Sequence, residues 1–310
     1  MDNITHSLIG AALGQAGLKR RTGLGMPALI IGANIPDVDA ACFFWLEGTE
    51  HLGFRRGITH GPIAWLVLPL LLAAGLWWYD RWQDRRGKRP EGRLPVNFKW
   101  LFLLGLIGTL SHPLFDWFNN YGVRFLEPFS SEWFYGDTLF IIDLWILLGL
   151  GLAVWLSRRR EQAGRGDWTR PAITALAVLT GYIGVNNAVS VASVQAVRTQ
   201  QPGLTLAMAN PVPVAFWQRE VLWRSADGHF GKVPCGFGTC DRLGPPLGRI
   251  NMADPRIARW AKGDPQAEAF LFWSRMPIAA PGPKGILLTD QRFMDVPTRG
   301  NFTVELKPRG

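Results

Sequence analysis

Long apolar runs fill the part of the chain before about residue 195 and constrain its fold more than any other feature. The cleanest of them, Ile63 to Tyr79, is long enough to cross the hydrocarbon core of a bilayer as a helix. The rest of the chain is mixed in polarity and rich in Pro and Gly. We therefore expect a helical membrane domain over residues 1–192 and a soluble domain over residues 193–310.

Six segments of the first domain are candidate membrane helices. The first is short for a full span and predicts a short or tilted helix, and the second contains Pro36 and several polar residues, which predicts a broken helix inside the bundle. The segments are Ile4 to Leu18, Met26 to Leu46, Ile63 to Tyr79, Phe98 to Phe118, Leu139 to Leu156 and Pro171 to about Val191. The predicted fold is mainly α, a polytopic membrane bundle of about six segments followed by a small α+β domain.

The distribution of basic residues predicts the orientation. The net charge of +9 would suggest a nucleic-acid partner in a soluble protein, but much of the excess lies in short clusters beside the apolar runs, so we expect no such partner. The loops after the first, third and fifth segments hold fifteen Lys and Arg residues, whereas the short segments on the other side hold three. Because basic loops stay cytoplasmic, the carboxy-terminal domain should be periplasmic. Reporters at Gly87 and Gly164 should report the cytoplasm, and one at Gly310 the periplasm.

Two features of the ends follow from composition. The amino terminus lacks a basic region before its apolar stretch, so we expect no cleaved signal peptide and a mature chain that retains His6. In the carboxy-terminal domain, Cys235 and Cys240 bracket a Gly-rich turn and could form a disulfide in an oxidising compartment, with a two-ligand metal site as the alternative.

In the same domain, strands are predicted over Val214–Trp223, Gly285–Thr289 and Phe302–Leu306, and helices over Ile257–Arg275 with a break at residues 263–265.

The chemistry centres on His112 and Asp116, which end the apolar run that begins at Phe98. Positions four apart lie on one face of a helix, so an imidazole and a carboxylate could converge on a single metal ion. Pro113, between them, either kinks the helix or begins a new one. The alternative for the pair alone is a helix-terminal histidine with a capping aspartate.

The predicted topology brings further polar residues to the same outer level. A carboxylate at a helix centre costs roughly 2.5–3.5 kcal/mol, so buried aspartates need partners, and a divalent metal can supply that compensation. Histidines mixed with carboxylates favour zinc, or manganese, over calcium or magnesium. The predicted ligands are His6, Asp37, Asp39, His60, His112 and Asp116, with Asp143 at the same level. Taken singly, His6 could be a helix-end residue, Asp37 and Asp39 could cap a helix, and Asp143 could be a buried hydrogen-bonding group.

Four ordered motifs in the first 190 residues resemble those of the YdjM-like family. They are His6-Ser7, Ile35-Pro36-Asp37-Val38-Asp39, Arg56-Gly57-Ile58-Thr59-His60-Gly61 and His112-Pro113-Leu114-Phe115-Asp116. The family comprises bacterial inner-membrane proteins described as LexA-regulated, metal-dependent hydrolases. The resemblance therefore implies an inner-membrane enzyme with a metal site.

A more distant likeness is to zinc-dependent phospholipase C and the S1/P1 nucleases. Their order of a His, an Asp, a His and a His-x-x-x-Asp is similar to His6, Asp39, His60 and the His112/Asp116 pair, and it implies that Asp116 bridges two metals. The chain departs from these enzymes because it lacks a second His-x-x-x-Asp and a further His after Asp116. We therefore expect one or two ions, with Asp37, Asp137 or Asp143 as replacement ligands.

These observations predict a hydrolase that acts on a lipid or lipid-linked phosphoester at the outer face of the membrane. A metal would supply an ionised water as nucleophile, and Asp37, Asp143 and Arg56 are the predicted catalytic residues. Arg55 and Arg56 could hold a phosphate, or they could anchor to lipid headgroups. The alternative function is a transporter or ion-conducting protein, because membrane carboxylates often line ion pathways. A third hypothesis, a scaffold for the periplasmic domain, leaves the buried carboxylates without a role.

Overall fold

The computed structural model of the chain describes residues 1–295 and 299–308. Its backbone contacts divide the chain into two compact units. Residues 1–38 and 56–185 form one, which we call the helical unit, and residues 39–55 and 186–310 form the other, which we call the sheet unit. Of the three boundaries, those after residues 38 and 185 fall inside helices, and the one after residue 55 falls in a turn. Gly310, whose predicted side of the membrane was given above, lies outside the described residues.

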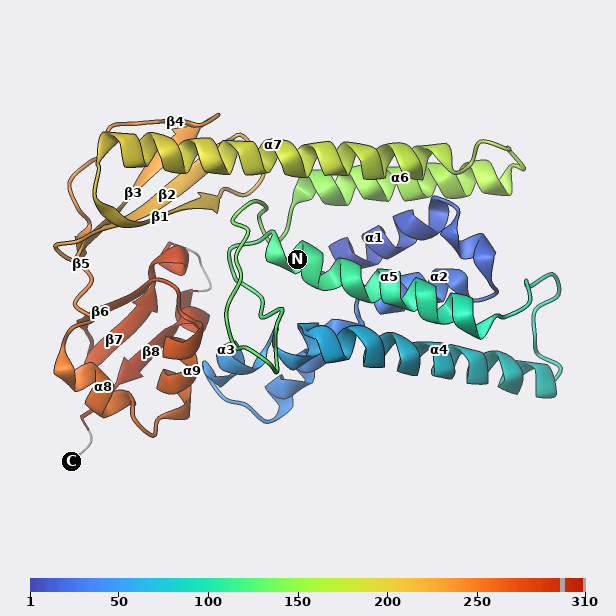
Figure 1. Ribbon diagram of the computed structural model, residues 1–310, viewed down its shortest axis with the longest axis horizontal. Helices are drawn as coiled ribbons and strands as arrows, with labels where there is room; N and C mark the ends of the chain where they lie inside the picture. Colours follow the sequence, from blue (N-terminus) through green and yellow to red (C-terminus); the bar gives the residue numbers. More distant parts are fainter. Residues whose placement is uncertain (296–298, 309–310) are drawn as a thin grey trace. The chain divides into compact units, whose positions relative to one another are not determined.

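The amino-terminal region is mainly helical, as predicted (Figure 1). Its elements are α1 (Asn3–Gln15), η1 (Leu18–Arg21), α2 (Gly25–Gly32), η2 (Ile35–Phe44), α3 (Glu50–Phe54), η3 (Ile58–His60), α4 (Pro62–Arg85), α5 (Phe98–Trp117), α6 (Leu144–Gln162) and α7 (Arg170–Gln200). Of the described helices, α4, α5 and α7 are long and apolar enough to cross a membrane, and α2 with η2, bent by 49°, could make a fourth span. That bend confirms the prediction of a broken second segment.

Helix α4 shows why these segments suit a membrane. Pro62 opens it at a position where the missing N–H costs nothing, and the apolar run continues through Pro69. Large apolar side chains remain exposed along it, including Leu66 at 60% and Leu71 at 61%. An apolar face of this extent would be a liability in water and is expected against lipid.

Helices α2 and α5 pack backbone against backbone at glycines. A Cβ atom added at Gly108 would lie 2.6 Å from the carbonyl oxygen of Leu29, and one added at Gly32 would lie 2.7 Å from the carbonyl oxygen of Gly105. Small residues allow membrane helices to approach this closely. The approach fixes α5, and with it the His112/Asp116 pair, against the bend that follows α2.

The basic loops of the helical unit meet at one end. Lys19 forms an ion pair with Glu161 at the end of α6, and its ammonium group lies 4.9 Å from the ring centre of Trp168. The N–H of Gly23 donates to the carbonyl oxygen of Pro95 at 3.1 Å, which joins the first basic cluster to the loop before α5. The three clusters that predict the cytoplasmic side therefore belong to one face of the unit.

The sheet unit carries two antiparallel sheets. Its strands are β1 (Leu204–Pro211), β2 (Gln218–Ser225), β3 (His229–Gly236), β4 (Thr239–Cys240), β5 (Gly248–Arg249), β6 (Pro277–Pro281), β7 (Ile286–Asp290) and β8 (Thr303–Leu306), and its later helices are α8 (Pro255–Ala261), α9 (Pro265–Trp273), η4 (Gln291–Phe293) and η5 (Arg299–Phe302). The larger sheet has the order β1-β2-β3-β4, with β5 beside β3, and the smaller has the order β6-β7-β8. Val221 of β2 stands between Ala209 and Val233, and all three are buried.

The structure refines the predicted elements of this unit. The strand expected from Val214 begins only at Gln218, because Val214 has a φ of 65°, which a β-branched residue in a strand cannot adopt. The predicted strands near residues 286 and 303 are present as β7 and β8, and the helical stretch breaks after Ala261 and resumes at Pro265. A disulfide joins Cys235 and Cys240, which face each other in the β3–β4 register.

Candidate metal centre

Five side chains from four elements of the helical unit gather in one buried place. His6 comes from α1, Asp37 from η2, His60 from η3, and His112 and Asp116 from α5. We call these five residues the histidine–aspartate cluster. All five were predicted as metal ligands, and each lies in a motif that resembles the YdjM-like family.

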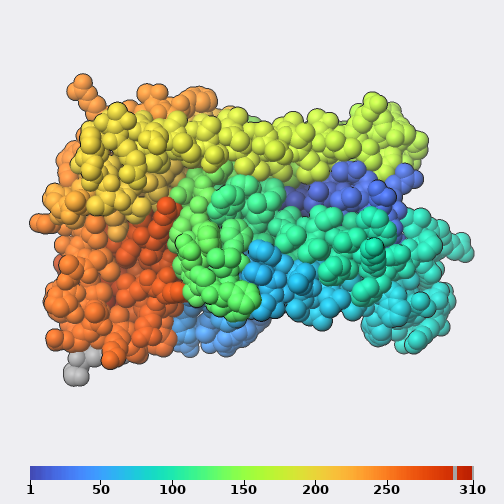
Figure 2. All heavy atoms as spheres, viewed as in Figure 1, coloured from blue at the N-terminus to red at the C-terminus, as the bar shows by residue number. Residues whose placement is uncertain are grey.

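The position of His6 follows from the start of α1. Asp2 is the N-cap, and its Oδ1 atom accepts hydrogen bonds from the N–H groups of Ile4 and Thr5, both at 3.0 Å. The face of α1 that carries His6 is buried, and Ile9 and Ala12 of this helix join a core that includes Phe115 of α5. In the space-filling view the dark-blue amino-terminal segment shows only as a narrow strip between its neighbours (Figure 2).

Helix α5 places His112 and Asp116 one turn apart on a single face. Of the two alternatives for Pro113, the structure has a helix that continues through it to Trp117. The Nδ1 atom of His112 lies 2.7 Å from the carbonyl oxygen of Ala33, at the end of α2. Because a carbonyl only accepts hydrogen bonds, Nδ1 carries the proton and Nε2 presents its lone pair to the cluster.

His60 is held in a similar way by its own motif. Its Nδ1 atom lies 2.9 Å from the hydroxyl oxygen of Thr59, and its carbonyl oxygen accepts a hydrogen bond of 2.7 Å from the indole of Trp65. The next residue, Gly61, is needed for a close approach, because a Cβ there would lie 1.9 Å from the carbonyl oxygen of Glu127. The loop after α5 therefore closes directly over the turn that carries His60.

The three imidazoles converge on the carboxylate of Asp116. The Nε2 atom of His6 lies 3.4 Å from Oδ1, and the Nε2 atoms of His60 and His112 lie 3.5 and 3.6 Å from Oδ2. Asp37 adds a second carboxylate, whose Oδ1 atom lies 3.7 Å from Nε2 of His112. The rings of His6 and His112 are stacked, with centroids 3.8 Å apart.

This arrangement fits a divalent metal. Ligand atoms about 2.0–2.1 Å from a tetrahedral ion stand roughly 3.3 Å from one another, close to the separations seen here. The Nε2 atoms of His6 and His112 are buried and make no hydrogen bond to any described residue, which is costly unless an ion or water is present. Two overlapping groups could hold an ion, His6 with His112 and Asp116, and Asp37 with His60 and His112.

Asp37 is the member of the cluster with access to the outside. Its side chain is 10% exposed, whereas those of the three histidines are fully buried. It borders a cavity of about 340 Å³ between the start of α1 and the α2–η2 bend. The other lining residues are Asn3, Ile30, Ile31, Asn34, Ile35 and Val38. Two amides and one carboxylate among apolar side chains make this opening amphipathic.

Positive charge from the chain itself also borders Asp116. The guanidinium of Arg56 forms a bidentate ion pair with the carboxylate, with Nε 3.0 Å from Oδ2 and Nη2 3.2 Å from Oδ1. Its Nη1 group donates a hydrogen bond of 3.1 Å to Oδ1 of Asn119. The α-amino group of Met1 contacts Oδ1. Arg56 has a φ of 56°, an uncommon backbone conformation for a residue with a side chain. Strain of this kind is often found at functional sites.

Two of the predicted site residues, Asp143 and Asp39, have partners outside the histidine–aspartate cluster. Asp143 is the N-cap of α6, where Oδ1 accepts from the N–H groups of Trp145 and Ile146 and Oδ2 accepts from the hydroxyl of Tyr182 at 2.9 Å. Asp39 belongs to the sheet unit, where Nε of Arg55 lies 3.4 Å from its Oδ1. Among the described residues, neither group that could hold an ion includes Asp39, Asp137 or Asp143.

The supporting residues were not found from the sequence. Asn119 is fully buried, and its Oδ1 accepts from both Arg56 and the N–H of Tyr121. The ring of Tyr121 lies 4.5 Å from the guanidinium carbon of Arg56. The only signal in the sequence is a polar Asn-Asn pair after an apolar span, which is equally typical of an ordinary loop.

Comparison with known proteins agrees with the four motifs. Residues 1–192 match the YdjM inner membrane protein family. The chain belongs to this family. It is also 27% identical over 165 residues to the uncharacterized protein YfhP of Bacillus subtilis (strain 168), a match that covers 50% of this chain and 46% of that protein. The chain thus spans about half the length of this relative, and no solved structure matches it.

Proposed function

We propose that this YdjM family member is a metal-dependent hydrolase that acts on a phosphoester of a lipid or lipid-linked substrate at the outer face of the inner membrane. The observation that carries the proposal is the convergence of the Nε2 atoms of His6, His60 and His112 on the buried carboxylate of Asp116. A cluster of this kind has no evident structural purpose, since apolar side chains would fill the space at lower cost.

The cluster residues would hold one or two divalent ions, zinc or manganese by the chemistry of their donors. When bound, such an ion supplies a water that ionises near neutral pH and offsets negative charge on a phosphoryl oxygen. His112 belongs to both groups, and the carboxylate of Asp116 lies within 3.6 Å of all three histidines. These two residues would be the central ligands. The hydrogen bond from His112 to Ala33 fixes the ring before an ion arrives.

Arg56 would offset charge on the substrate. Its guanidinium is held on two sides by Asp116 and Asn119, so its position is fixed before the reaction. A guanidinium has five N–H donors in a rigid fork that suits phosphate oxygens. The side chain is 6% exposed, so it would act on a group that enters the cluster and not on lipid headgroups outside it.

Asp37 would act as the general base at the opening of the site. It is the one cluster carboxylate that borders a cavity, and this cavity mixes amide and apolar side chains. A substrate with a polar ester and an apolar tail matches such a lining better than a free, fully polar phosphate does. The mixed lining of this cavity therefore favours a lipid substrate.

An ion pathway is the alternative function, and the buried faces of the helices weigh against it. Between the cluster and Asp80 near the other end of α4, the buried residues of α4 are Ala64, Pro69, Leu72 and Ala73. Those of α5 before His112 are apolar apart from Thr109. A conducting path needs polar groups spaced across the bilayer.

The finer membrane topology is also part of the proposal. We propose that α1 and α6 join the candidate spans to give about six segments, with the basic loops in the cytoplasm and the sheet unit in the periplasm. Helix α1 has 13 residues, too few for a full span, so it would insert from the outer face as a partial one. Helix α6 is apolar over its first half and basic in its last turn.

The test combines metal content with turnover in the full chain purified in detergent. Wild type should contain one or two divalent ions and hydrolyse a phospholipid presented in mixed micelles. Asp37→Asn should lower kcat by about 100-fold or more, as expected for a lost general base. Asp80→Asn is the matched control, because Asp80 is also a buried aspartate in a membrane helix but is paired with Arg93. Equal turnover in wild type and Asp37→Asn, or wild type without a divalent ion, would refute the proposal.

A further inference from the structure

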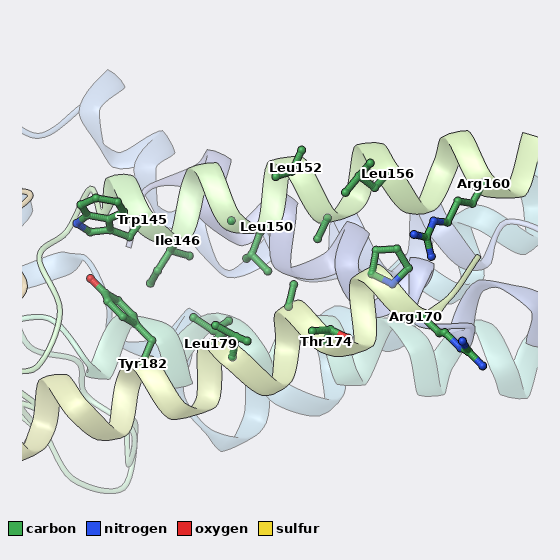
Figure 3. A pocket seen from close by; sticks show the side chains of 15 residues that line it. Trp145, Ile146, Leu150, Leu152, Leu156, Arg160, Arg170, Thr174, Leu179 and Tyr182 are labelled. Carbon is green, nitrogen blue, oxygen red and sulfur yellow. The ribbon is translucent and has the colours of Figure 1, made fainter. Parts of the chain in front are cut away.

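A second and larger cavity lies between α6 and α7, within the helical unit. Its volume is about 540 Å³, within the range of small-molecule sites. Figure 3 shows side chains of both helices facing it, with Trp145 and Tyr182 at one end and Arg160 and Arg170 at the other. Apolar side chains line the stretch between the two ends, among them Leu150, Leu152, Leu156, Val178 and Leu179.

The cavity exists because the side chains on its walls are small where the helices face each other. Gly149 and Ala153 of α6 and Thr174 and Ala175 of α7 all line it. Small residues usually let membrane helices come into contact, yet a Cβ atom added at Gly149 would meet no atom within 4 Å. An apolar slot is therefore open at this position.

The slot has the length and polarity of a lipid tail. From Trp145 to Arg160 the helix rises roughly 22 Å, more than the about 15 Å of one hydrocarbon leaflet. Trp145 and Tyr182 lie at the other end of the slot, where the hydroxyl of Tyr182 donates a hydrogen bond to Asp143. Trp and Tyr are typical of a membrane interface. A single acyl chain that starts at the arginine end would fit within the slot.

Charge at the arginine end selects the headgroup. Arg160 forms one ion pair with Asp167 at 3.1 Å, and its side chain is 34% exposed, so part of its donor fork faces outward. Arg170 is exposed, and the described residues provide no ion pair for it. It is also the first residue of α7, where the helix dipole adds positive potential. The end of the cavity is therefore suited to an anion despite the single carboxylate of Asp167.

We propose that the slot between α6 and α7 binds an anionic phospholipid, with one acyl chain between the helices and the headgroup phosphate at Arg160 and Arg170. This end of α6 and α7 belongs to the face that carries the basic loops, so the lipid would come from the cytoplasmic leaflet, where anionic headgroups attract basic residues. The inference concerns a different site from the histidine–aspartate cluster and does not depend on metal chemistry.

The test is native mass spectrometry of the full chain in detergent, titrated with dioleoylphosphatidylglycerol or dioleoylphosphatidylcholine. Wild type should retain one phosphatidylglycerol and bind it on the order of tenfold more tightly than phosphatidylcholine, since basic residues near a membrane surface each contribute about 1 kcal/mol. Arg160→Gln with Arg170→Gln should remove this preference. Arg85→Gln with Arg86→Gln is the control, because those arginines end α4 and do not line the cavity.

A pair of glycine variants tests the acyl slot separately. Gly149→Leu should fill the cavity and abolish retention of either lipid at this site. Gly151→Leu should not, because Gly151 has equally open surroundings but does not line the cavity. Unchanged elution and melting temperature would show that the variants fold. Equal binding of the two lipids by wild type, undiminished lipid on Gly149→Leu, or a dimer in place of bound lipid would overturn the proposal.

Discussion

Nε2 of His112 lies 3.6 Å from Oδ2 of Asp116, one turn along the same helix and inside the protein. Both groups belong to one of the sets that could hold an ion, and Nε2 of His112 is buried and makes no hydrogen bond to any described residue. Substitutions of this pair therefore distinguish most clearly between a metal centre and a structural polar contact.

We predict that Asp116→Asn and His112→Ala lose bound metal. The asparagine keeps the size of the side chain but removes the charge that offsets the cation, so metal affinity should fall by more than about 100-fold, beyond the usual effect of losing a supporting contact. Metal stoichiometry of the purified protein is the measurement. Asp143→Asn is the control, since asparagine caps helices as well as aspartate does and α6 should be unaffected. Unchanged metal in the first two folded variants would rule out the centre described here.

We predict that Gly108→Ala disturbs the cluster without touching it. The new Cβ would lie 2.6 Å from the carbonyl oxygen of Leu29, so α2 must move away from α5, at a cost of about 1–3 kcal/mol. The movement would stretch the hydrogen bond between His112 and Ala33, and metal affinity should fall together with the melting temperature. Gly75→Ala on α4 is the matched control, because nothing lies within 4 Å of that position. Equal metal content and melting temperature in both variants would contradict the close packing.

Five of the predicted ligands lie together in the structure, and they could be selected from the sequence because they stand out chemically. Charged and imidazole side chains are costly in apolar segments, so His6, His60 and Asp116 could be picked out as candidate ligands before any fold was known. Asp37 and Asp39 show the limit of such reasoning. They lie two residues apart on η2, a 3₁₀ helix with about three residues per turn, so their side chains leave its axis in different directions. Composition cannot tell which of them joins the cluster.

Long-range pairing was harder to predict than local structure. Strands β1 and β3 were not predicted, although they flank β2 on both sides. Residues 39–55 group with the sheet unit, where Thr49 donates to the carbonyl oxygen of Gln266 at 2.8 Å. They fall within residues 1–192, which the apolar runs predict as a membrane domain. Contacts across more than 200 residues leave no periodic signal in the sequence. The disulfide was predictable because Cys235 and Cys240 are close neighbours in the chain.

We predict that the sheet unit loses stability in acid through Asp290. Burial raises the pKa of this carboxyl, but the guanidinium of Arg292, at 2.9 Å, and a hydrogen bond from Ser274 together hold the pKa below its ordinary value. The stabilisation is therefore present above the unfolded pKa of about 3.9 and is lost as the pH falls through the lower folded value. Limited proteolysis between pH 7 and pH 2 measures it.

The substitution Asp290→Asn should weaken the same unit at neutral pH. It leaves a buried guanidinium without its carboxylate, which costs about 3–5 kcal/mol, and it should also flatten the pH dependence. The control is Asp254→Asn, because Asp254 and Arg256 form the same pair two residues apart but on the surface. A surface pair of this kind contributes little, so this variant should resemble wild type. An acid profile of Asp290→Asn that follows wild type would refute the assignment.

We predict that the Cys235–Cys240 disulfide forms in the mature protein and steadies the end of the larger sheet. The two residues are paired in the β3–β4 register, and β4 has only two residues, so few other contacts keep this strand in place. Closing so short a loop stabilises the folded state by about 2 kcal/mol in the chain-entropy description. Peptide mass mapping without reductant should find the bridge in protein isolated from the membrane, and Cys235→Ala with Cys240→Ala should increase proteolysis between β3 and β5. Cys42→Ala should leave the bridge intact, because Cys42 is a buried free thiol. Two free thiols at Cys235 and Cys240 in that protein would contradict both the bridge and the periplasmic location proposed for this unit.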